Sequence, residues 1–295
     1  MNIMRFSTLY LLFSIIVMSA SIAVLIAFGL NLGIDFRGGS VMEVLYEEEV
    51  PSNQIIAEQI SGLEIGSPHI QPIGEKGIVI RMQDITEEVH QSVLLSLGEG
   101  VTESKFESIG PVIGKELQEK TIILVSLSLL AIVLYITFAF RRISGQVKFW
   151  HWSFAALFAL VHDLLVPLGV FAVLGFLYDI QINIPIVVAL LTVVGYSIND
   201  TVVVFDRIRE NIGRKPKSTL SEIVDLSIKQ ALSRSLGTST TTLFVLVSLY
   251  FLGGETLRYF ALALIAGVIA GTYSSLFVAP TILVKWLGRR NNIDK

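Results

Sequence analysis

Of the ionisable residues that lie within or directly beside the long apolar runs of this sequence, three are candidates for chemistry. Asp163, next to His162, and Asp200 each interrupt such a run, and Arg234 opens another. Ionisable groups inside membrane-spanning helices are costly, and they usually mark proton relays or substrate paths. A carboxylate in such a place can bind and release a proton, whereas an arginine stays charged and can only bias a nearby carboxylate. The chemistry that these residues predict is proton transfer within a membrane.

Polar neighbours extend two of these sites along helix faces. At helical spacing, Asn199 shares one broad face with Thr192, and Asp200 flanks that face. Thr238 stands four residues after Arg234 and begins a stripe of threonines on the same face. Such hydroxyls bind water or bond back to the backbone of their own helix. Asn199 and Thr238 therefore join the candidate functional residues.

Each ionisable candidate also has a structural interpretation. Asp163 is either a protonatable group or a buried carboxylate that hydrogen-bonds to a neighbouring helix. Asp200 is either a proton site that faces a helix bundle or a helix-end aspartate that reaches interfacial water. Arg234 is either part of the same site or a basic flank that orients its helix in the membrane.

The composition predicts a membrane protein and excludes several kinds of site. Of 295 residues, 53% are hydrophobic and 16% are charged, and the mean hydropathy is +0.69. Soluble domains carry about 25% charged residues. The absence of cysteine excludes disulfides and Cys-based metal centres, and four histidines do not make a rich metal centre. The net charge of −3 argues against nucleic-acid binding, and the glycine-rich residues 33–39 lack the Walker A lysine.

Six stretches have the roughly 20 apolar residues that a membrane-spanning helix needs. The first is longer than the apolar part of a signal peptide, so we expect it to remain as a helix. A capping-box pattern at Thr219 and Glu222 begins an amphipathic segment before Arg234, which we expect at the membrane surface. The six predicted spans are 6–34, 121–140, 149–178, 180–205, 235–254 and 259–284.

The basic residues predict how these spans are oriented. Most Lys and Arg residues fall at the N-terminus, in the loops 141–148 and 206–234, and in the tail, so both termini are predicted to be cytoplasmic. The external segment carries more acidic than basic residues, which suits a solvated face. The predicted division of the chain is 1–30 for the first span, 31–120 for the external domain, 121–284 for the other spans and 285–295 for the cytoplasmic tail.

The external segment has the pattern of a small α+β domain. Its predicted elements are a strand at 39–47, a helix from Ser52, strands at 69–73 and 77–82, a helix after 84–87 and a strand at 102–109. This βαββαβ order is typical of a ferredoxin-like domain. No catalytic constellation appears in it, so we expect no enzyme. The predicted fold is a polytopic α-helical membrane protein with one ferredoxin-like domain between the first two of six transmembrane helices.

Several motifs along the chain are similar to those of one protein family. Residues 33–39, which include Asp35, Gly38 and Gly39, are similar to its GIDFxGG signature. Residues 161–163, 195–211 and 233–242 are similar to its motifs in the third, fourth and fifth helices. With six spans and one large external domain, the chain resembles the SecF family of bacterial protein-translocase subunits, within the resistance–nodulation–division superfamily. The resemblance covers nearly the whole chain and is least specific in the external domain.

This resemblance implies a subunit of the bacterial inner membrane that pairs with SecD. Such subunits act with the SecY–SecE–SecG channel, often with YajC, and use the proton-motive force to complete the export of preproteins threaded by SecA. The resemblance places Asp200 and Arg234 in the proton path, with a further carboxylate supplied by SecD. Asp35 lies at the membrane–domain junction, where a turn and a coupling role are both open. Membrane lipid is an expected partner; nucleic acid, metal ions and cofactors are not.

Two other classes of function stay open on the sequence. One is a proton-coupled small-molecule transporter that is built on the same architecture. The other is a passive scaffold that only stabilises a translocase. Composition does not separate these classes, and the motifs favour protein export.

Overall fold

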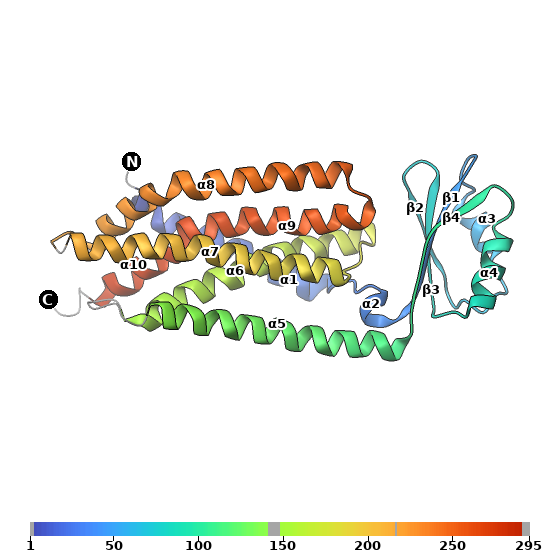
Figure 1. Cartoon of the computed structure of the whole chain (residues 1–295), viewed down its shortest axis with the longest axis horizontal. Coiled ribbons are helices and arrows are strands. Elements are labelled where there is room, and N and C mark those ends of the chain that lie inside the picture. The colour runs from blue at the N-terminus through green and yellow to red at the C-terminus, as the bar shows by residue number, and fades with distance from the viewer. Residues whose placement is uncertain (1–2, 141–147, 216, 291–295) are drawn as a thin grey trace. The chain divides into compact units, whose positions relative to one another are not determined.

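The computed structural model describes residues 3–140, 148–215 and 217–290, which fold into two compact units (Figure 1). The helical unit comprises Met1–Asn31 and Val125–Lys295, and the α+β unit comprises Leu32–Leu124. Apart from Lys148, the expected loop 141–148 lies outside the described residues.

The long helices confirm the prediction of a six-span membrane protein. Within the described residues, six segments are long and apolar enough to cross a bilayer. They are α1 (Ser7–Phe28), α5 (Pro111–Ala139), α6 (Phe149–Tyr178), α7 (Ile184–Arg214), α8 (Leu220–Leu252) and a last span made of α9 (Glu255–Tyr273), a π-helical turn η2 (Ser274–Val278) and α10 (Ala279–Arg290). The chain is therefore a multi-pass membrane protein.

Helices α7 and α8 extend beyond their apolar stretches, so most of the predicted loop 206–234 is helical. Thr219 and Glu222 form the predicted capping box, because the Glu222 N–H donates to Thr219 Oγ1 (3.3 Å) and the Thr219 N–H donates to Glu222 Oε2 (2.9 Å). The segment that follows differs from the prediction of a surface-lying helix. Its Val224 and Ile228 are buried in the core of the helical unit, where they pack with α7.

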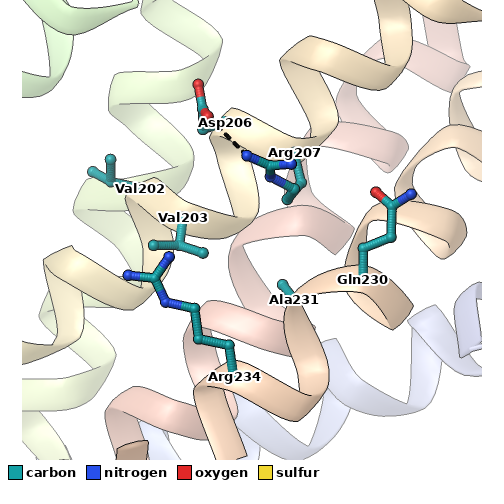
Figure 2. Close-up of a pocket in the computed structure, with 7 residues that line it drawn as sticks. All are labelled: Val202, Val203, Asp206, Arg207, Gln230, Ala231 and Arg234. Carbon is teal, nitrogen blue, oxygen red and sulfur yellow. Dashed lines mark ion pairs between the residues drawn. The ribbon is translucent and has the colours of Figure 1, made fainter.

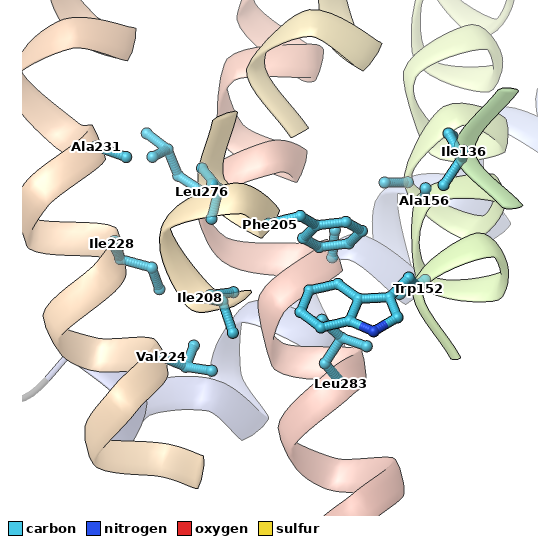
Figure 3. Packing of buried hydrophobic residues seen from close by; sticks show 14 of the residues in the cluster. Ile136, Trp152, Ala156, Phe205, Ile208, Val224, Ile228, Ala231, Leu276 and Leu283 are labelled. Carbon is cyan, nitrogen blue, oxygen red and sulfur yellow. The ribbon is translucent and has the colours of Figure 1, made fainter. Parts of the chain in front are cut away.

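An apolar cluster joins the helices of the helical unit (Figure 3). At its centre Trp152 of α6 is fully buried. Its ring stacks on Phe140 with centroids 5.2 Å apart and meets Phe205 of α7 edge-on at 5.0 Å. Offset and edge-to-face aromatic pairs stabilise a core beyond the area that they bury. This cluster holds α7 firmly against α6 and α8.

The beginning of the chain is fastened to the same core. A single 3-10 turn, η1 (Ile3–Phe6), precedes α1, and its Ile3 and Met4 are buried. The backbone N–H groups of both residues donate to Oδ1 of Asp225 on α8. Asp225 thereby satisfies donors that a helix end leaves without intrahelical partners.

Glycines on α9 allow it to approach α7 closely. A Cβ atom added at Gly267 would lie 2.1 Å from a methyl group of Val193, and one at Gly271 would lie 2.9 Å from the Cβ of Ser197. Val193 is buried and β-branched, so its side chain cannot rotate away easily. Small residues permit such close helix contacts inside membranes.

We expect Gly267→Ala to destabilise the protein by about 1–3 kcal/mol, the range measured for overpacked cores. The added methyl group would force α7 and α9 apart. The measurement is the thermal unfolding midpoint of the detergent-solubilised protein. Gly213→Ala on α7 is the control, because a Cβ there meets nothing within 4 Å. Equal midpoints for both variants would contradict the packing argument.

The α+β unit confirms the predicted βαββαβ order. Its elements are α2 (Ile34–Arg37), β1 (Gly39–Tyr46), α3 (Asn53–Gln59), β2 (His69–Ile73), β3 (Gly77–Met82), α4 (Glu87–Ser96) and β4 (Val101–Ile109). The strands form one antiparallel sheet in the order β2-β3-β1-β4. Alternate residues such as Met42 and Ile80 point to a core shared with Ile56 of α3 and Val93 of α4. The ferredoxin-like topology follows from this arrangement.

The two glycines of the predicted signature make the turn from α2 into β1. Gly38 and Gly39 have φ angles of +77° and +128°, which side chains rarely tolerate. A Cβ at Gly38 would lie 2.6 Å from the Cα of Pro111, and one at Gly39 would lie 2.8 Å from the carbonyl oxygen of Met82. Asp35 lies half-buried in the first turn of α2. The geometry supports a turn role for both glycines.

Candidate functional site

Asp200 lies on α7, buried in the helical unit. It is 5% exposed, and its Oδ2 atom has no hydrogen-bond partner among the described residues. The groups of α8 that act on its carboxylate are Ser235, whose buried hydroxyl makes no well-formed hydrogen bond with the described residues, and the positive charge of Arg234. A buried carboxylate with spare acceptor capacity beside a permanent cation is suited to bind a proton reversibly.

Arg234 acts on this carboxylate by its charge and lines an open pocket. Its side chain is exposed and makes no hydrogen bond or ion pair with the described part of the chain. Figure 2 shows it directed towards Val203 of α7. The pocket has a volume of about 540 Å³ and is lined by Val202, Val203, Asp206, Arg207, Gln230, Ala231 and Arg234. Asp200 is not among the lining residues, whereas Arg234 lines the pocket and its charge also acts on the buried acid.

The other two predicted residues of this region are exposed and make no hydrogen bond with the Asp200 carboxylate. Asn199 is exposed, and its amide has no partner within the described ranges. Thr238 is exposed as well, and its hydroxyl donates to the carbonyl oxygens of Arg234 (3.1 Å) and Ser235 (3.0 Å). The threonine stripe therefore bonds back to its own helix, one of the two predicted arrangements.

These exposed groups give α7 and α8 a polar face within their apolar spans. Asn199 of α7 and Thr238 of α8 both belong to it, and nothing in the described chain covers Asn199. An unpaired amide is costly in contact with hydrocarbon, because lipid offers no hydrogen-bond partner. The polar face therefore requires either water or another polypeptide against it.

Asp163 occupies a different environment from Asp200, although both are candidates for a proton site on the sequence. It is fully buried on α6, and both carboxylate oxygens have partners. Its Oδ1 lies 2.9 Å from Nδ1 of His162, and its Oδ2 accepts hydrogen bonds from Ser197 of α7 and from Ser274 of η2, the latter at 2.7 Å. One side chain therefore joins three segments.

Sequence reasoning missed the hydroxyl groups that complete these sites. Ser197 and Ser274 bind Asp163, and a second hydroxyl chain runs from Tyr196 to Ser239 (3.3 Å) and on to Thr272 (2.6 Å). Serine and threonine in apolar spans were visible in the sequence, but the periodicity of one helix does not show which residue of another helix it meets. Their contacts link α7, α8 and α9 through polar side chains.

The α+β unit contains a buried histidine that the sequence did not single out. His90 of α4 has Nε2 2.7 Å from Glu103 of β4 and Nδ1 3.2 Å from Glu87, and its ring stacks on Phe106 at 3.8 Å. Hydrogen bonds from Gln91 and His90 hold the pKa of the Glu87 carboxyl below its usual value. These contacts fix α4 on the sheet. Among the described residues, no three His, Asp or Glu side chains are grouped to hold a metal ion.

Six spans, an α+β unit after the first span and ionisable residues on α6, α7 and α8 define a polytopic membrane protein with a polar site among its helices. Residues 89–289 match the family described as "Protein export membrane protein SecD/SecF, C-terminal", and residues 23–50 match the SecD/SecF GG motif. The chain belongs to the SecD/SecF family. The GG motif contains Gly38 and Gly39, whose conformation is described above.

Individual relatives are similar over almost the whole chain. The protein translocase subunit SecF of Thermobaculum terrenum is 36% identical, with 97% of this chain and 93% of the relative covered. The protein translocase subunit SecF of Vibrio alginolyticus is 39% identical, with 96% and 88% covered. The crystal structure of SecDF, a translocon-associated membrane protein from Thermus thermophilus, superposes with a TM-score of 0.86 at 32% identity. That match covers 98% of this chain and 39% of the SecDF chain.

Proposed function

We propose that this chain is the SecF-type subunit of the Sec protein-export machinery in the bacterial inner membrane. With SecD, it uses the proton-motive force to promote the late steps of preprotein translocation. Asp200 binds and releases the proton, and Arg234 biases its protonation and faces the pocket between α7 and α8. The 36–39% identity to SecF subunits over nearly their full length supports this function.

The observation that carries the mechanism is the incomplete environment of the site. Asp200 has an unpaired buried oxygen, and the polar face beside it includes the uncovered amide of Asn199. A SecD carboxylate and SecD helices against this face would complete it. The similarity to SecDF supports this assignment, because the present chain corresponds to only 39% of that longer protein.

The remaining partners and the orientation belong to the same proposal. Both termini are cytoplasmic, the α+β unit is external, and the subunit acts beside the SecY–SecE–SecG channel, often with YajC, after SecA has threaded the preprotein. The concentration of Lys and Arg in the segments predicted as cytoplasmic supports this orientation. The external unit acts on emerging chains, which the membrane helices cannot reach.

The decisive experiment combines partner identification with transport. The full chain is produced in cells depleted of their own SecF; we expect it to copurify with SecD and to restore proton-dependent secretion. Drug efflux without SecD would instead identify a small-molecule transporter. Secretion that persists after every intramembrane acid is replaced would identify a scaffold.

Arg234→Lys should reduce proton-dependent secretion by roughly tenfold, the effect of about 1.4 kcal/mol. Lysine keeps one positive charge but lacks the planar fork of five donors that can hold Asp200 and a partner carboxylate together. The measurement is secretion at normal membrane levels of the variant. Arg214→Lys is the control, since Arg214 lies exposed at the end of α7. Full activity of both variants would show that Arg234 serves only to orient its helix in the membrane.

A further inference from the structure

We propose that Asp163 is a positioning residue that fixes α7 one helical turn from the proton site and does not itself carry the transported proton. The inference rests on the proposed function, in which Asp200 is the group that binds the proton. It assigns different roles to the two buried acids of the helical unit, because their surroundings differ. Two acidic residues in contrasting environments commonly have different roles in one mechanism.

The hydrogen bonds of Asp163 are those of a structural junction. Ser197 of α7 and Ser274 of the π-helical turn donate to the same oxygen, Oδ2, while His162 faces Oδ1 at 2.9 Å. Three partners offset the cost of burying the carboxylate. Protonation of Oδ2 would disturb two contacts between segments, whereas Asp200 has an oxygen that no described residue binds.

The junction lies one helical turn from Asp200. Ser197 precedes Asp200 by three residues on α7, so the hydroxyl held by Asp163 sets the height and rotation of the turn that carries the proton site. Gly271 of α9 packs on the same serine, with room for no side chain, since a Cβ there would lie 2.9 Å from the Cβ of Ser197. Ser197 is thus held from two sides.

The π-helical turn η2 carries one of the two serines that bind Asp163. Single π-turns inside helices are uncommon and frequently occur at functional sites. Here the turn begins at Ser274, whose hydroxyl also bonds Gly271 O at 3.2 Å, and the last span continues as α10 afterwards. It thereby brings a hydroxyl donor to Asp163 while Gly271 stays against α7.

The substitution Asp163→Asn distinguishes a positioning role from a proton-transfer role. In Asp163→Asn, the amide oxygen can accept from both serines and the NH₂ group can donate to Nδ1 of a neutral His162. All three contacts survive, but the side chain no longer takes up a proton. A positioning residue tolerates this change, whereas a proton carrier does not.

The test uses the full chain with SecD in membranes. We expect Asp163→Asn to keep secretion within about threefold of normal, while Ser197→Ala/Ser274→Ala reduces it by roughly tenfold, the effect of losing hydrogen bonds to a charged group. The second measurement is the reaction of Asp200 with dicyclohexylcarbodiimide against pH, read by mass spectrometry, because this reagent modifies protonated buried carboxyls. The serine variant should shift the pH midpoint of that reaction.

Helices α6, α8, α9 and α10 pack against α7, and their titratable residues include Asp163 and His162 of α6, Arg234 of α8 and Tyr273 of α9, with the others closer to the helix ends. All of them are unchanged in the serine variant, so a shifted midpoint reports a displaced Asp200. If the double variant falls below the normal membrane level, Ser197→Ala and Ser274→Ala are measured singly.

Two results would overturn the proposal. Loss of secretion in Asp163→Asn, as severe as in Asp200→Asn, would make Asp163 a proton carrier. An unchanged labelling midpoint in the serine variants would make the junction structural only. Failure of the proposed function gives a different result, because Asp200→Asn itself would then secrete normally.

Discussion

Replacing Asp200 with asparagine should abolish proton-dependent secretion while the protein still inserts and binds SecD. Asparagine has nearly the same shape, so the packing of α7 against α8 and α9 is retained. It cannot alternate between a charged and a neutral form, which proton coupling requires. We expect secretion to fall to the level of cells that lack this subunit. The measurement is secretion of a preprotein with and without an uncoupler, at matched membrane levels.

Glu210→Gln is the matched control for this experiment. Glu210 lies on the same helix, also changes from carboxylate to amide, and is partly exposed in ion pairs with Arg207 (2.7 Å) and Arg214 (2.7 Å). Exposed ion pairs contribute only about 0–1 kcal/mol, so this variant should secrete normally. Uncoupler-sensitive secretion by a stably inserted Asp200→Asn protein would remove Asp200 from the proton path.

Deleting residues 34–110 of the α+β unit should leave an inserted but inactive subunit. The variant joins residue 33 to residue 111 by a flexible Gly/Ser linker, which retains the whole of α1 and α5. The six spans each have enough apolar residues to insert without this unit. Secretion should fall to the background level, because the membrane helices alone cannot act on an emerging chain. Membrane level, SecD copurification and secretion are measured together.

The same linker placed in the β2–β3 turn serves as the control. Glu75 lies in this exposed turn of the sheet, and insertions at loop tips are generally tolerated. That variant should retain the folded unit and its activity. Normal secretion by the deletion variant would show that the α+β unit is dispensable.

Most of the fold could be predicted from two patterns in the sequence. Long apolar runs indicate the membrane-spanning helices, and short alternating runs indicate the strands. Strands β2 and β3 have the predicted bounds of 69–73 and 77–82, because glycine-containing turns delimit short alternating runs. The boundary of α7 was less predictable. Polar residues after Phe205 ended the apolar run, but the helix continues to Arg214 because helices persist in water when they pack on a core and form ion pairs.

The candidate site was predictable only in its ionisable members. Asp200 and Arg234 stand out because charges in apolar spans are rare, and this rule needs no knowledge of packing. The serines that bind Asp163 could not be found in that way. Ser274 is separated from Asp163 by 111 residues, and it lies at the start of a π-helical turn. Sequence periodicity assumes a regular helix and misses such a turn.

The attachment of η1 to Asp225 also determines when, during synthesis, this turn can form its final contacts. Ile3 is synthesised before Asp225, because the carboxylate that receives its N–H lies 222 residues later in the chain. At roughly 5–20 residues per second, synthesis needs about 10–40 s to produce that partner. Until then η1 lacks this anchor, although α1 can already pack on α6. The turn η1 therefore reaches its final contacts only after the beginning of α8 has been made, so its attachment reports that the chain has been synthesised and folded at least as far as α8.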